Sequence, residues 1–453
     1  MSLRLRDKHY EIDMLNGPVM PRLLSFALPL MLSSILQLTF NAADVIVVGR
    51  FEGDAALAAV GTPGSLINLI INLFLGLSVG ANVVVAQCCG AGNYRDTSEA
   101  VHTSVGLSLL GGVCMGAVGF FLAGTFLKLM NTPQEVLPLA TSYVRIYFLG
   151  LPANMLYNFG AAILRATGDT RRPLAYLTIA GVTNVALNLL FVIVFHMGVS
   201  GVALATITAQ AISAMLVLLC LLRSDGPIRL ELKKIRLHRD KVWRIAKVGL
   251  PAGLQSMLFS ISNVMIQTTI NGFGKTIVAG SVASSNLEGY VYVAMNSVYQ
   301  AAITFTGQNV GAGRCERISR VARASLLAVM GIGLTLGGLL MLGKGILPRL
   351  YTNDDAVVAA AAVRSSIIAP TYFLCGIMEV MVGMLRGMGS SLLPMAVTVM
   401  GVCVLRILWI LTVFPLSPTP PTLYLSYPVS WIITFVAHAV CYLRVKKKRF
   451  PMA

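Results

Sequence analysis

The sequence predicts an all-α membrane protein with twelve transmembrane helices in two six-helix bundles. Of its 453 residues, 56% are hydrophobic and only 12% are charged, whereas a soluble protein carries about 25% charged residues. Runs without charge locate the helices, and an internal repeat divides them into two bundles. The composition therefore excludes an ordinary water-soluble globule, and the formal net charge of +17 has to be explained at a membrane.

The uncharged runs have the lengths of membrane spans. One run of 21 residues separates Arg22 from Asp44, and one of 50 residues separates Arg172 from Arg223. Because about 20 residues cross roughly 30 Å of hydrocarbon, the first run holds one span and the second holds two, folded back near His196. With interruptions at Gly and Pro taken as turns, the predicted spans in chain order are 21–48, 57–87, 103–127, 137–164, 173–196, 200–222, 246–272, 277–309, 324–343, 357–386, 391–415 and 422–443.

Basic residues orient these spans. Most of the 35 Lys and Arg residues lie in the N-terminal tail, in the turns that follow even-numbered spans, in the segment 223–247 and in the C-terminal tail. Cytoplasmic loops collect Lys and Arg, so we predict a multi-pass protein of the plasma (inner) membrane with both termini in the cytoplasm. Anionic lipid then explains the positive charge, and no nucleic-acid partner is needed. About 20 polar residues precede the first span, so no cleavable signal peptide is expected.

The chain repeats itself with a displacement of 221 residues. Two motifs recur at this distance, Gln87-x-x-Gly90-Ala91-Gly92 as Gln308-x-x-Gly311-Ala312-Gly313, and Leu164-Arg165-x-x-Gly168 as Leu385-Arg386-x-x-Gly389. Six spans return a chain to its starting side, so the halves are predicted to be related by a two-fold axis along the membrane normal, with a cleft between them. The predicted parts are a tail (1–20), a bundle (21–222), a basic linker (223–245), a second bundle (246–443) and a basic tail (444–453).

Rows of polar side chains mark the helix faces that line this cleft. In the first span, Gln37, Asn41 and Asp44 are spaced by four and three residues and share one face. Amides that face lipid would each cost roughly 2 to 7 kcal/mol, so these faces contact protein or water. Helix packing through Ser and Asn hydrogen bonds is the alternative. The predicted cleft residues are Gln37, Asn41, Asn68, Asn72, Asn154, Asn158, Ser256, Ser260, Asn263, Gln267, Tyr292 and Asn296.

Few ionisable residues lie at membrane depth. Asp44 is the only acid within the spans of the first half, and its repeat counterpart is Ile266. Intramembrane acids usually mark a proton or ion path, and an ion pair with Arg50 is the alternative. Glu379 and Glu288, in the second half, are candidates either for ion coupling or for structural bonds. Three intramembrane arginines, Arg145, Arg364 and Arg406, are expected to anchor the bundles.

Neither nucleotide chemistry nor catalysis is predicted. Gly274-Lys275-Thr276 ends like a phosphate-binding loop, but the upstream glycine that such a loop requires is Thr269. The eight cysteines are scattered with no CxxC pair, so neither a disulfide framework nor a metal site is expected. An HExxH motif is absent from the sequence. We therefore predict a protein that is not an enzyme, needs no cofactor, and is driven by an ion gradient.

Several motifs together resemble the multidrug and toxic compound extrusion (MATE) family. They are the segment Asp44-Val45-Ile46-Val47-Val48-Gly49-Arg50, the paired Gln-x-x-Gly-Ala-Gly turns, Leu164-Arg165-Ala166-x-Gly168-Asp169 and Gly198-x-x-Gly201-Val202-Ala203-x-Ala205-Thr206. The resemblance extends over nearly the whole chain. It implies a V-shaped pair of six-helix bundles that exports varied, often cationic, compounds in exchange for protons or sodium ions.

The resemblance also implies a coupling site. Family members place an acid on the first span beside an Asn-x-x-x-Asp pair on the fifth and a Thr on the sixth, and the matching residues here are Asp44, Asn184, Asn188 and Thr206. Asn188 departs from the pattern, because the family's common acid has become an amide. The acids of the sodium-binding branch are also missing, with Glu379 the nearest acid, so the proton is the expected coupling ion and sodium is the second choice.

The predicted function is an antiporter that exports amphipathic, often cationic, drugs or toxic compounds by rocking of two bundles. The alternative is a flippase for a lipid-linked saccharide, which shares this architecture and would use Arg145, Arg364 and Arg406 to bind headgroups. An intramembrane enzyme would need a nucleophile and base at matched spacing, which the sequence lacks. The expected partners are organic cations and membrane lipid, and the chain is expected to be a monomer.

Overall fold

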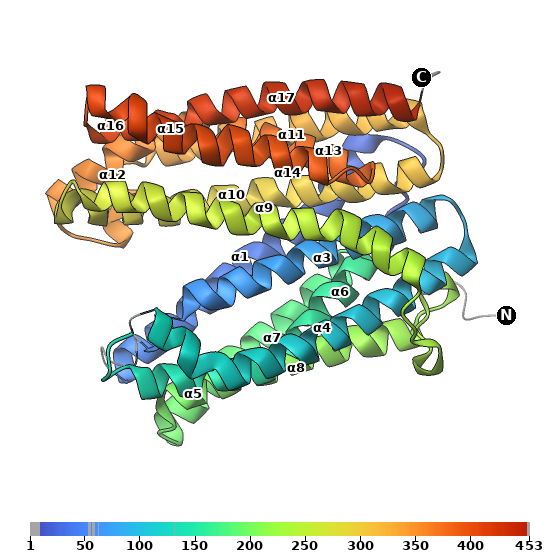
Figure 1. Cartoon of the computed structure of the whole chain (residues 1–453), viewed down its shortest axis with the longest axis horizontal. Helices are drawn as coiled ribbons and strands as arrows, with labels where there is room; N and C mark the ends of the chain where they lie inside the picture. Colours follow the sequence, from blue (N-terminus) through green and yellow to red (C-terminus); the bar gives the residue numbers. More distant parts are fainter. Residues whose placement is uncertain (1–9, 53–55, 57–58, 62, 131, 451–453) are drawn as a thin grey trace. The chain divides into compact units, whose positions relative to one another are not determined.

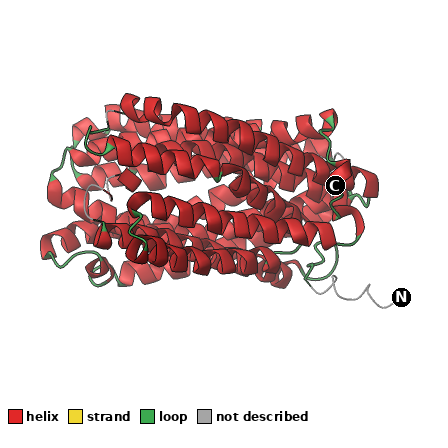
Figure 2. Cartoon of the chain, turned by 90° about the horizontal axis from the view of Figure 1, so that it is seen from below, coloured by secondary structure: helices red, strands yellow, loops and turns green. Residues whose placement is uncertain are grey.

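The computed structural model describes residues 10–52, 56, 59–61, 63–130 and 132–450, and every regular element in these ranges is a helix (Figure 2). The all-α prediction is therefore confirmed for the described residues. Nine helical stretches among them are long and apolar enough to cross a membrane. Large apolar side chains such as Phe121 and Leu342 remain exposed, as expected where the surrounding solvent is hydrocarbon rather than water.

The chain forms two compact units. The N-terminal unit comprises Met1–Ile12 and Leu32–Gly249, and the C-terminal unit comprises Asp13–Met31 and Leu250–Ala453. Two long helices contribute to both units, α1 (Val19–Phe51) and α9 (Arg239–Asn271), and each contains a proline near the point where it passes from one unit to the other, Pro29 or Pro251.

In the N-terminal unit, α6 is the central helix and contacts α3, α4 and α8 (Figure 1). Small residues let these backbones approach, since a Cβ added to Gly112 of α4 would lie 2.5 Å from the Pro152 backbone and one on Gly160 of α6 would lie 2.2 Å from Val217. The further helices of this unit are α3 (Gly64–Gly90), α4 (Tyr94–Leu129), α5 (Leu137–Leu149), α6 (Leu151–Thr167), α7 (Arg171–Leu189) with a π-helical turn (Leu190–Val194), and α8 (Gly198–Arg223).

In the C-terminal unit, α10 and α13 form the centre, because α10 contacts α11, α12 and α13 while α13 also contacts α17. An apolar cluster that includes Ile266, Met378 and Trp431 fills the space between α9, α13 and α17. The helices are α10 (Lys275–Gly311), α11 (Cys315–Leu342), α12 (Asp355–Ile368), α13 (Tyr372–Gly387), α14 (Leu392–Thr398), a π-helical turn (Val399–Val404), α15 (Leu405–Thr412), α16 (Pro420–Tyr424) and α17 (Ser426–Arg449).

The predicted spans coincide with helices, but their ends differ. The third span was placed at 103–127, whereas α4 begins at Tyr94, because the helix continues beyond its apolar part into polar residues. The fourth is divided at Gly150 into α5 and α6. The second was placed at 57–87; residues 57 and 58 lie outside the described residues, and α3 begins at Gly64. Charge and apolar length locate the crossing, whereas helix ends depend on local capping.

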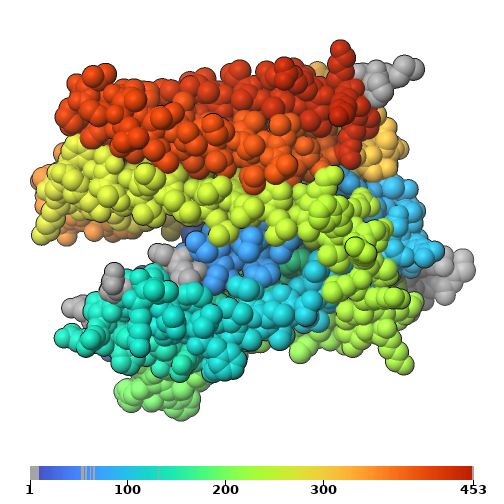
Figure 3. Space-filling model, in the orientation of Figure 1, coloured from blue at the N-terminus to red at the C-terminus, as the bar shows by residue number. Residues whose placement is uncertain are grey.

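The basic linker is folded against the N-terminal unit. The backbone N–H of Glu231 donates to His102 Nε2 at 3.0 Å, and the Thr103 hydroxyl donates to the Arg236 carbonyl at 3.3 Å. Lys241, only 3% exposed, forms an ion pair with Asp96 at 2.6 Å. In Figure 3, the yellow-green segment that follows α8 lies beside light-blue atoms of the same unit. The predicted first bundle ended at 222, whereas the N-terminal unit continues to Gly249.

Part of the predicted N-terminal tail is equally well held. Met14 is fully buried, and its carbonyl accepts hydrogen bonds from Asn309 Nδ2 at 3.2 Å and from Arg317 Nε at 3.1 Å. Arg317 also donates to the carbonyls of Asn16 and Gly17. Because this segment is not helical, its carbonyls are free to accept, and the arginines at the start of α11 supply the donors. These contacts place Asp13–Met31 in the C-terminal unit.

Gly168, which ends α6, is required by both conformation and space. Its φ is +104°, and an added Cβ would lie 2.6 Å from the Ile12 carbonyl oxygen. We expect Gly168→Ala to lower the free energy of unfolding by roughly 2 to 4 kcal/mol, since it combines left-handed strain with a backbone clash. Gly92→Ala is the matched control, because its φ is +66° but nothing lies within 4 Å. Thermal unfolding in detergent measures both, and equal melting temperatures would contradict the role of the Ile12 contact.

Candidate functional site

A polar cavity of about 110 Å³ lies inside the N-terminal unit, between α1, α6, α7 and α8. Its wall brings together seven of the residues predicted from the sequence, namely Gln37, Asn41, Asp44, Asn154, Asn158, Asn184 and Thr206. The close approach of α1 to α7 is possible because Gly181 has no side chain, since an added Cβ would lie 1.8 Å from the Phe40 ring. The cavity is therefore shaped by a glycine that the sequence analysis did not identify.

Asp44 is held by an amide rather than by a cation. Asn188 Nδ2 donates to Asp44 Oδ1, and the same nitrogen lies 3.4 Å from Asn184 Oδ1. The Asp44 side chain is half-buried, and among the described residues no Lys or Arg forms an ion pair with it. Arg50, the alternative partner, is exposed. An ionised Asp44 would therefore face the cavity with its charge uncompensated.

Thr206 completes the neutral surroundings of Asp44. It lies on α8, lines the same cavity, and its hydroxyl donates to the Val202 carbonyl of its own helix at 2.9 Å. A hydroxyl has one proton to donate and two lone pairs to accept with. The oxygen of Thr206 can therefore still accept a hydrogen bond from a protonated acid or a ligand in the cavity.

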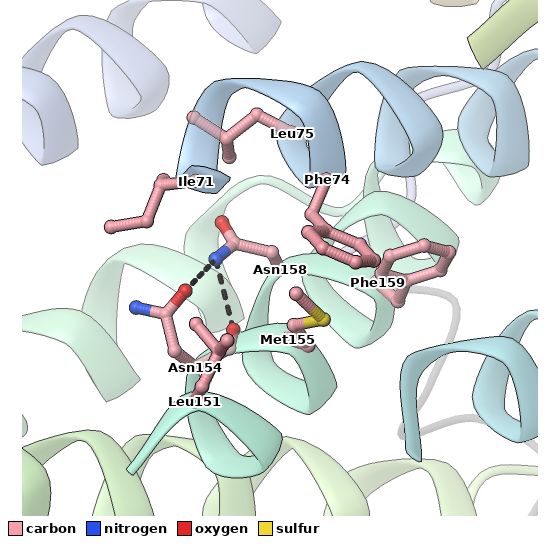
Figure 4. Close-up of a pocket in the computed structure, with 8 residues that line it drawn as sticks. All are labelled: Ile71, Phe74, Leu75, Leu151, Asn154, Met155, Asn158 and Phe159. Atoms are coloured by element: carbon pink, nitrogen blue, oxygen red, sulfur yellow. Dashed lines mark hydrogen bonds between the residues drawn. The ribbon is translucent and has the colours of Figure 1, made fainter. Parts of the chain in front are cut away.

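Two amides of α6, those of Asn154 and Asn158, form another part of the cavity wall. Asn158 Nδ2 donates to both the carbonyl and the Oδ1 of Asn154, at 2.9 and 3.0 Å (Figure 4). Figure 4 shows the two amides pointing toward each other beside apolar residues of α3, including Ile71 and Leu75. These residues line a second, mostly apolar pocket of only about 10 Å³. Asn154 and Asn158 therefore line both this small apolar pocket and the larger polar cavity.

Sequence reasoning missed two polar residues of the cavity, Gln210 and Ser213 on α8. With Thr206 they are spaced by four and three residues, so they share one helix face. Gln210 Oε1 is buried and has no hydrogen-bond partner among the described residues. The spacing was the signal that could have identified them, because the same pattern identified the row on the first span.

The other predicted cleft residues do not line this cavity. Asn68 and Asn72 lie on α3. Six more belong to the C-terminal unit, namely Ser256, Ser260, Asn263 and Gln267 on α9, and Tyr292 and Asn296 on α10. The hydroxyls of Ser256 and Ser260 donate to carbonyls of their own helix, so these bonds distinguish neither a cleft nor packing between helices. Their role in a cleft stays a prediction.

The acids of the C-terminal unit have different surroundings. Glu379, on α13, is half-buried and makes no hydrogen bond or ion pair with the described residues. Glu288, on α10, is 4% exposed and forms two hydrogen bonds with Arg364, at 2.9 and 2.8 Å. Because this pair is buried and bidentate, the structural bond is the better interpretation of Glu288. No group of three or more acidic, His or Cys side chains that could hold a metal occurs in the described part of the chain.

Comparison with known proteins identifies the family. The MatE family model matches residues 29–190 and 251–411, once in each half of the chain. The chain belongs to the MATE family. It is therefore a multi-pass membrane transporter and not an enzyme, as predicted from the motifs.

Relatives and solved structures agree with this assignment. The chain is 29% identical to the "Probable multidrug resistance protein YpnP" of Bacillus subtilis over 87% of this chain and 88% of that one. It is 26% identical to the "Probable multidrug resistance protein NorM" of Thermotoga maritima over 85% and 83%. A MOP-superfamily transporter from Pyrococcus furiosus shares the MATE fold at a TM-score of 0.88, 22% identity and coverage of 97% and 98%. A variant of the Vibrio cholerae transporter VcmN shares the fold at a TM-score of 0.87 and 19% identity, over 95% of this chain and 97% of that one.

Proposed function

We propose that this MATE transporter exports amphipathic organic cations in exchange for protons, with Asp44 as the group that binds them alternately. The observation that carries the proposal is a carboxylate inside the cavity that is hydrogen-bonded to an amide and has no cationic partner among the described residues. Such a carboxylate can bind either a proton or the transported organic cation, but not both at once. The multidrug names of its relatives support a drug-like cargo.

The size of the electrostatic effect is sufficient for exchange. Two unit charges 4 Å apart interact by about 4 kcal/mol at an effective dielectric constant of 20. This corresponds to roughly a thousandfold in affinity. Protonation of Asp44 removes this attraction, so a bound cation is released, and loss of the proton restores the site.

The volume of the cavity limits how the cargo binds. Pockets for drug-sized ligands measure about 300 to 1,000 Å³, whereas this cavity measures about 110 Å³. It therefore holds only part of a drug-sized compound, and the remainder of the compound lies outside it. Amides such as Asn41, Asn154 and Gln210 offer hydrogen bonds to varied headgroups without fixing one shape.

Efflux from proteoliposomes tests the proposal. Vesicles containing the purified protein and ethidium, a fluorescent organic cation, are given either a pH gradient or a sodium gradient. We expect the pH gradient alone to drive ethidium against its concentration gradient. If a sodium gradient alone drives ethidium transport, the coupling ion is sodium and not the proton. If the protein moves a lipid-linked saccharide but not ethidium, the flippase is the better assignment.

The Asn188 amide is expected to support this exchange. Hydrogen bonds to charged groups contribute about 1.5 to 3 kcal/mol, so we expect Asn188→Leu to lower the rate of proton-driven ethidium efflux by roughly tenfold or more. Thr183→Val is the matched control on α7, because its exposed hydroxyl bonds only to the Ile179 carbonyl of its own helix. Efflux rates at one fixed pH gradient measure the effect, and equal rates in the two variants would remove Asn188 from the site.

A further inference from the structure

The C-terminal unit contains a buried guanidinium whose hydrogen bonds are incomplete. Arg406, on α15, is 1% exposed, and its Nε donates to Ser430 Oγ at 3.0 Å. Its Nη1 and Nη2 atoms are buried and have no hydrogen-bond partner among the described residues. None of the described acids lies within ion-pair distance of it either. A buried charge without a partner costs several kcal/mol, so this arrangement calls for an acceptor.

Aromatic rings surround Arg406 but do not supply this acceptor. The ring centroids of Tyr427, Trp431 and Phe259 lie 4.2, 5.8 and 6.0 Å from its Cζ atom. Ring faces attract a cation through their quadrupoles, yet the N–H groups of a guanidinium point outward in its own plane. Trp431 Nε1 is a further buried donor without a partner. The surroundings are therefore rich in donors and poor in acceptors.

The charges around Tyr427 leave one positive charge unbalanced. A second guanidinium, that of Arg364, lies 5.6 Å from the same Tyr427 ring. Arg364 is neutralised by Glu288 through the bidentate pair described above. Two arginines and one carboxylate leave a net charge of +1, and that charge belongs to Arg406. A single negative charge would balance the cluster.

The position of Arg406 in the repeat also points to a binding site. The displacement of 221 residues pairs it with Val185, the neighbour of Asn184 in the cavity of the N-terminal unit. A π-helical turn (Val399–Val404) ends two residues before Arg406, and such turns occur frequently at functional sites. The corresponding helices of the two halves thus carry different polar groups, the amides Asn184 and Asn188 on α7 and the base Arg406 on α15.

We propose that Arg406 binds one small monovalent anion of halide size inside the C-terminal unit. The anion accepts hydrogen bonds from the guanidinium edge and balances the cluster. The anion has to be small, because Arg406 is only 1% exposed and aromatic rings surround its guanidinium. Valence follows from the charge count, since a divalent anion would leave the cluster negative. This site is separate from the proposed exchange at Asp44 and does not depend on it.

Equilibrium binding of radiolabelled chloride tests the proposal. The purified protein is placed in a gluconate buffer, whose anion is too large for the site. We expect saturable binding of one chloride per chain, with displacement by bromide. Arg406→Gln should lose this binding, and Arg406→Lys, which keeps the charge but not the planar fork, should weaken it at least tenfold. Arg349→Gln, which removes an exposed arginine paired with Asp355, should bind as the unmodified protein does.

A second measurement needs no variant. Replacing gluconate by chloride at constant ionic strength should raise the melting temperature of the unmodified protein by roughly 2 °C or more. The absence of saturable chloride binding by the unmodified protein would overturn the proposal, as would unchanged binding in a folded Arg406→Gln variant. Displacement by acetate but not by bromide would overturn the halide assignment in favour of a carboxylate.

Discussion

Replacing Asp44 by Asn is expected to abolish proton-driven accumulation of ethidium outside the cell or vesicle while leaving the protein folded. The amide has nearly the same shape and can still bond to Asn188, but it can neither ionise nor bind a proton. Without the charge, ethidium affinity should fall by up to about a thousandfold. Efflux under a pH gradient and equilibrium ethidium binding measure the two effects.

The control for this variant is Glu52→Gln, which removes an equal charge just beyond the end of α1. Its efflux should match that of the unmodified protein. Glu379→Gln tests the competing assignment, because Glu379 is the other acid predicted to couple the ion. If Asp44→Asn transports normally and Glu379→Gln does not, coupling belongs to the C-terminal unit and the proposed role of Asp44 is wrong.

Replacing Glu288 by Gln is expected to lower the free energy of unfolding by about 3 to 5 kcal/mol. The change leaves Arg364 buried without its carboxylate, and an uncompensated buried charge is far more costly than the loss of an ordinary hydrogen bond. The amide keeps one oxygen that can accept from the Ser284 hydroxyl, which lies 2.9 Å from Glu288 Oε1, but its NH2 group faces the Arg364 guanidinium with a donor instead of an acceptor. Chemical or thermal unfolding of the purified protein measures the loss.

A double variant separates the charge effect from local packing. Glu288→Gln combined with Arg364→Met removes both charges, so we expect it to recover much of the stability lost in the single variant. Equal instability of the single and double variants would show that shape rather than charge holds this part of α10 and α12. A single variant as stable as the unmodified protein would contradict the importance of the pair altogether.

Several features of the site could be predicted from the sequence because they depend on spacing along one helix. The row that contains Gln37, Asn41 and Asp44 requires only the helical period to share a face. The association of Asp44 with Asn188 and Thr206 came from resemblance to the MATE family, and contacts in the cavity agree with it. Gln210 shows the same kind of spacing signal, since it lies four residues after Thr206 on α8.

Other features required contacts between residues far apart in sequence. Nothing in the spacing of Glu288 and Arg364, which are 76 residues apart, indicates that they pair. Nor does it indicate that none of the described acids pairs with Arg406. The sequence predicted the segment around Lys241 only as a basic linker and the segment around Met14 only as a tail. That the linker is held by the Lys241–Asp96 ion pair and that Met14 is buried required the structure.

By itself, the sequence determined that this chain is an all-helical membrane protein of two repeated halves and which family it belongs to. Apolar length and charge decide where a chain can lie in hydrocarbon, and both are local properties of the sequence. Only the tertiary structure decided which polar groups share a cavity, which buried charges are neutralised and which are not. The reason is that desolvation and pairing depend on side chains contributed by several helices, whose approach is set by packing at residues such as Gly181.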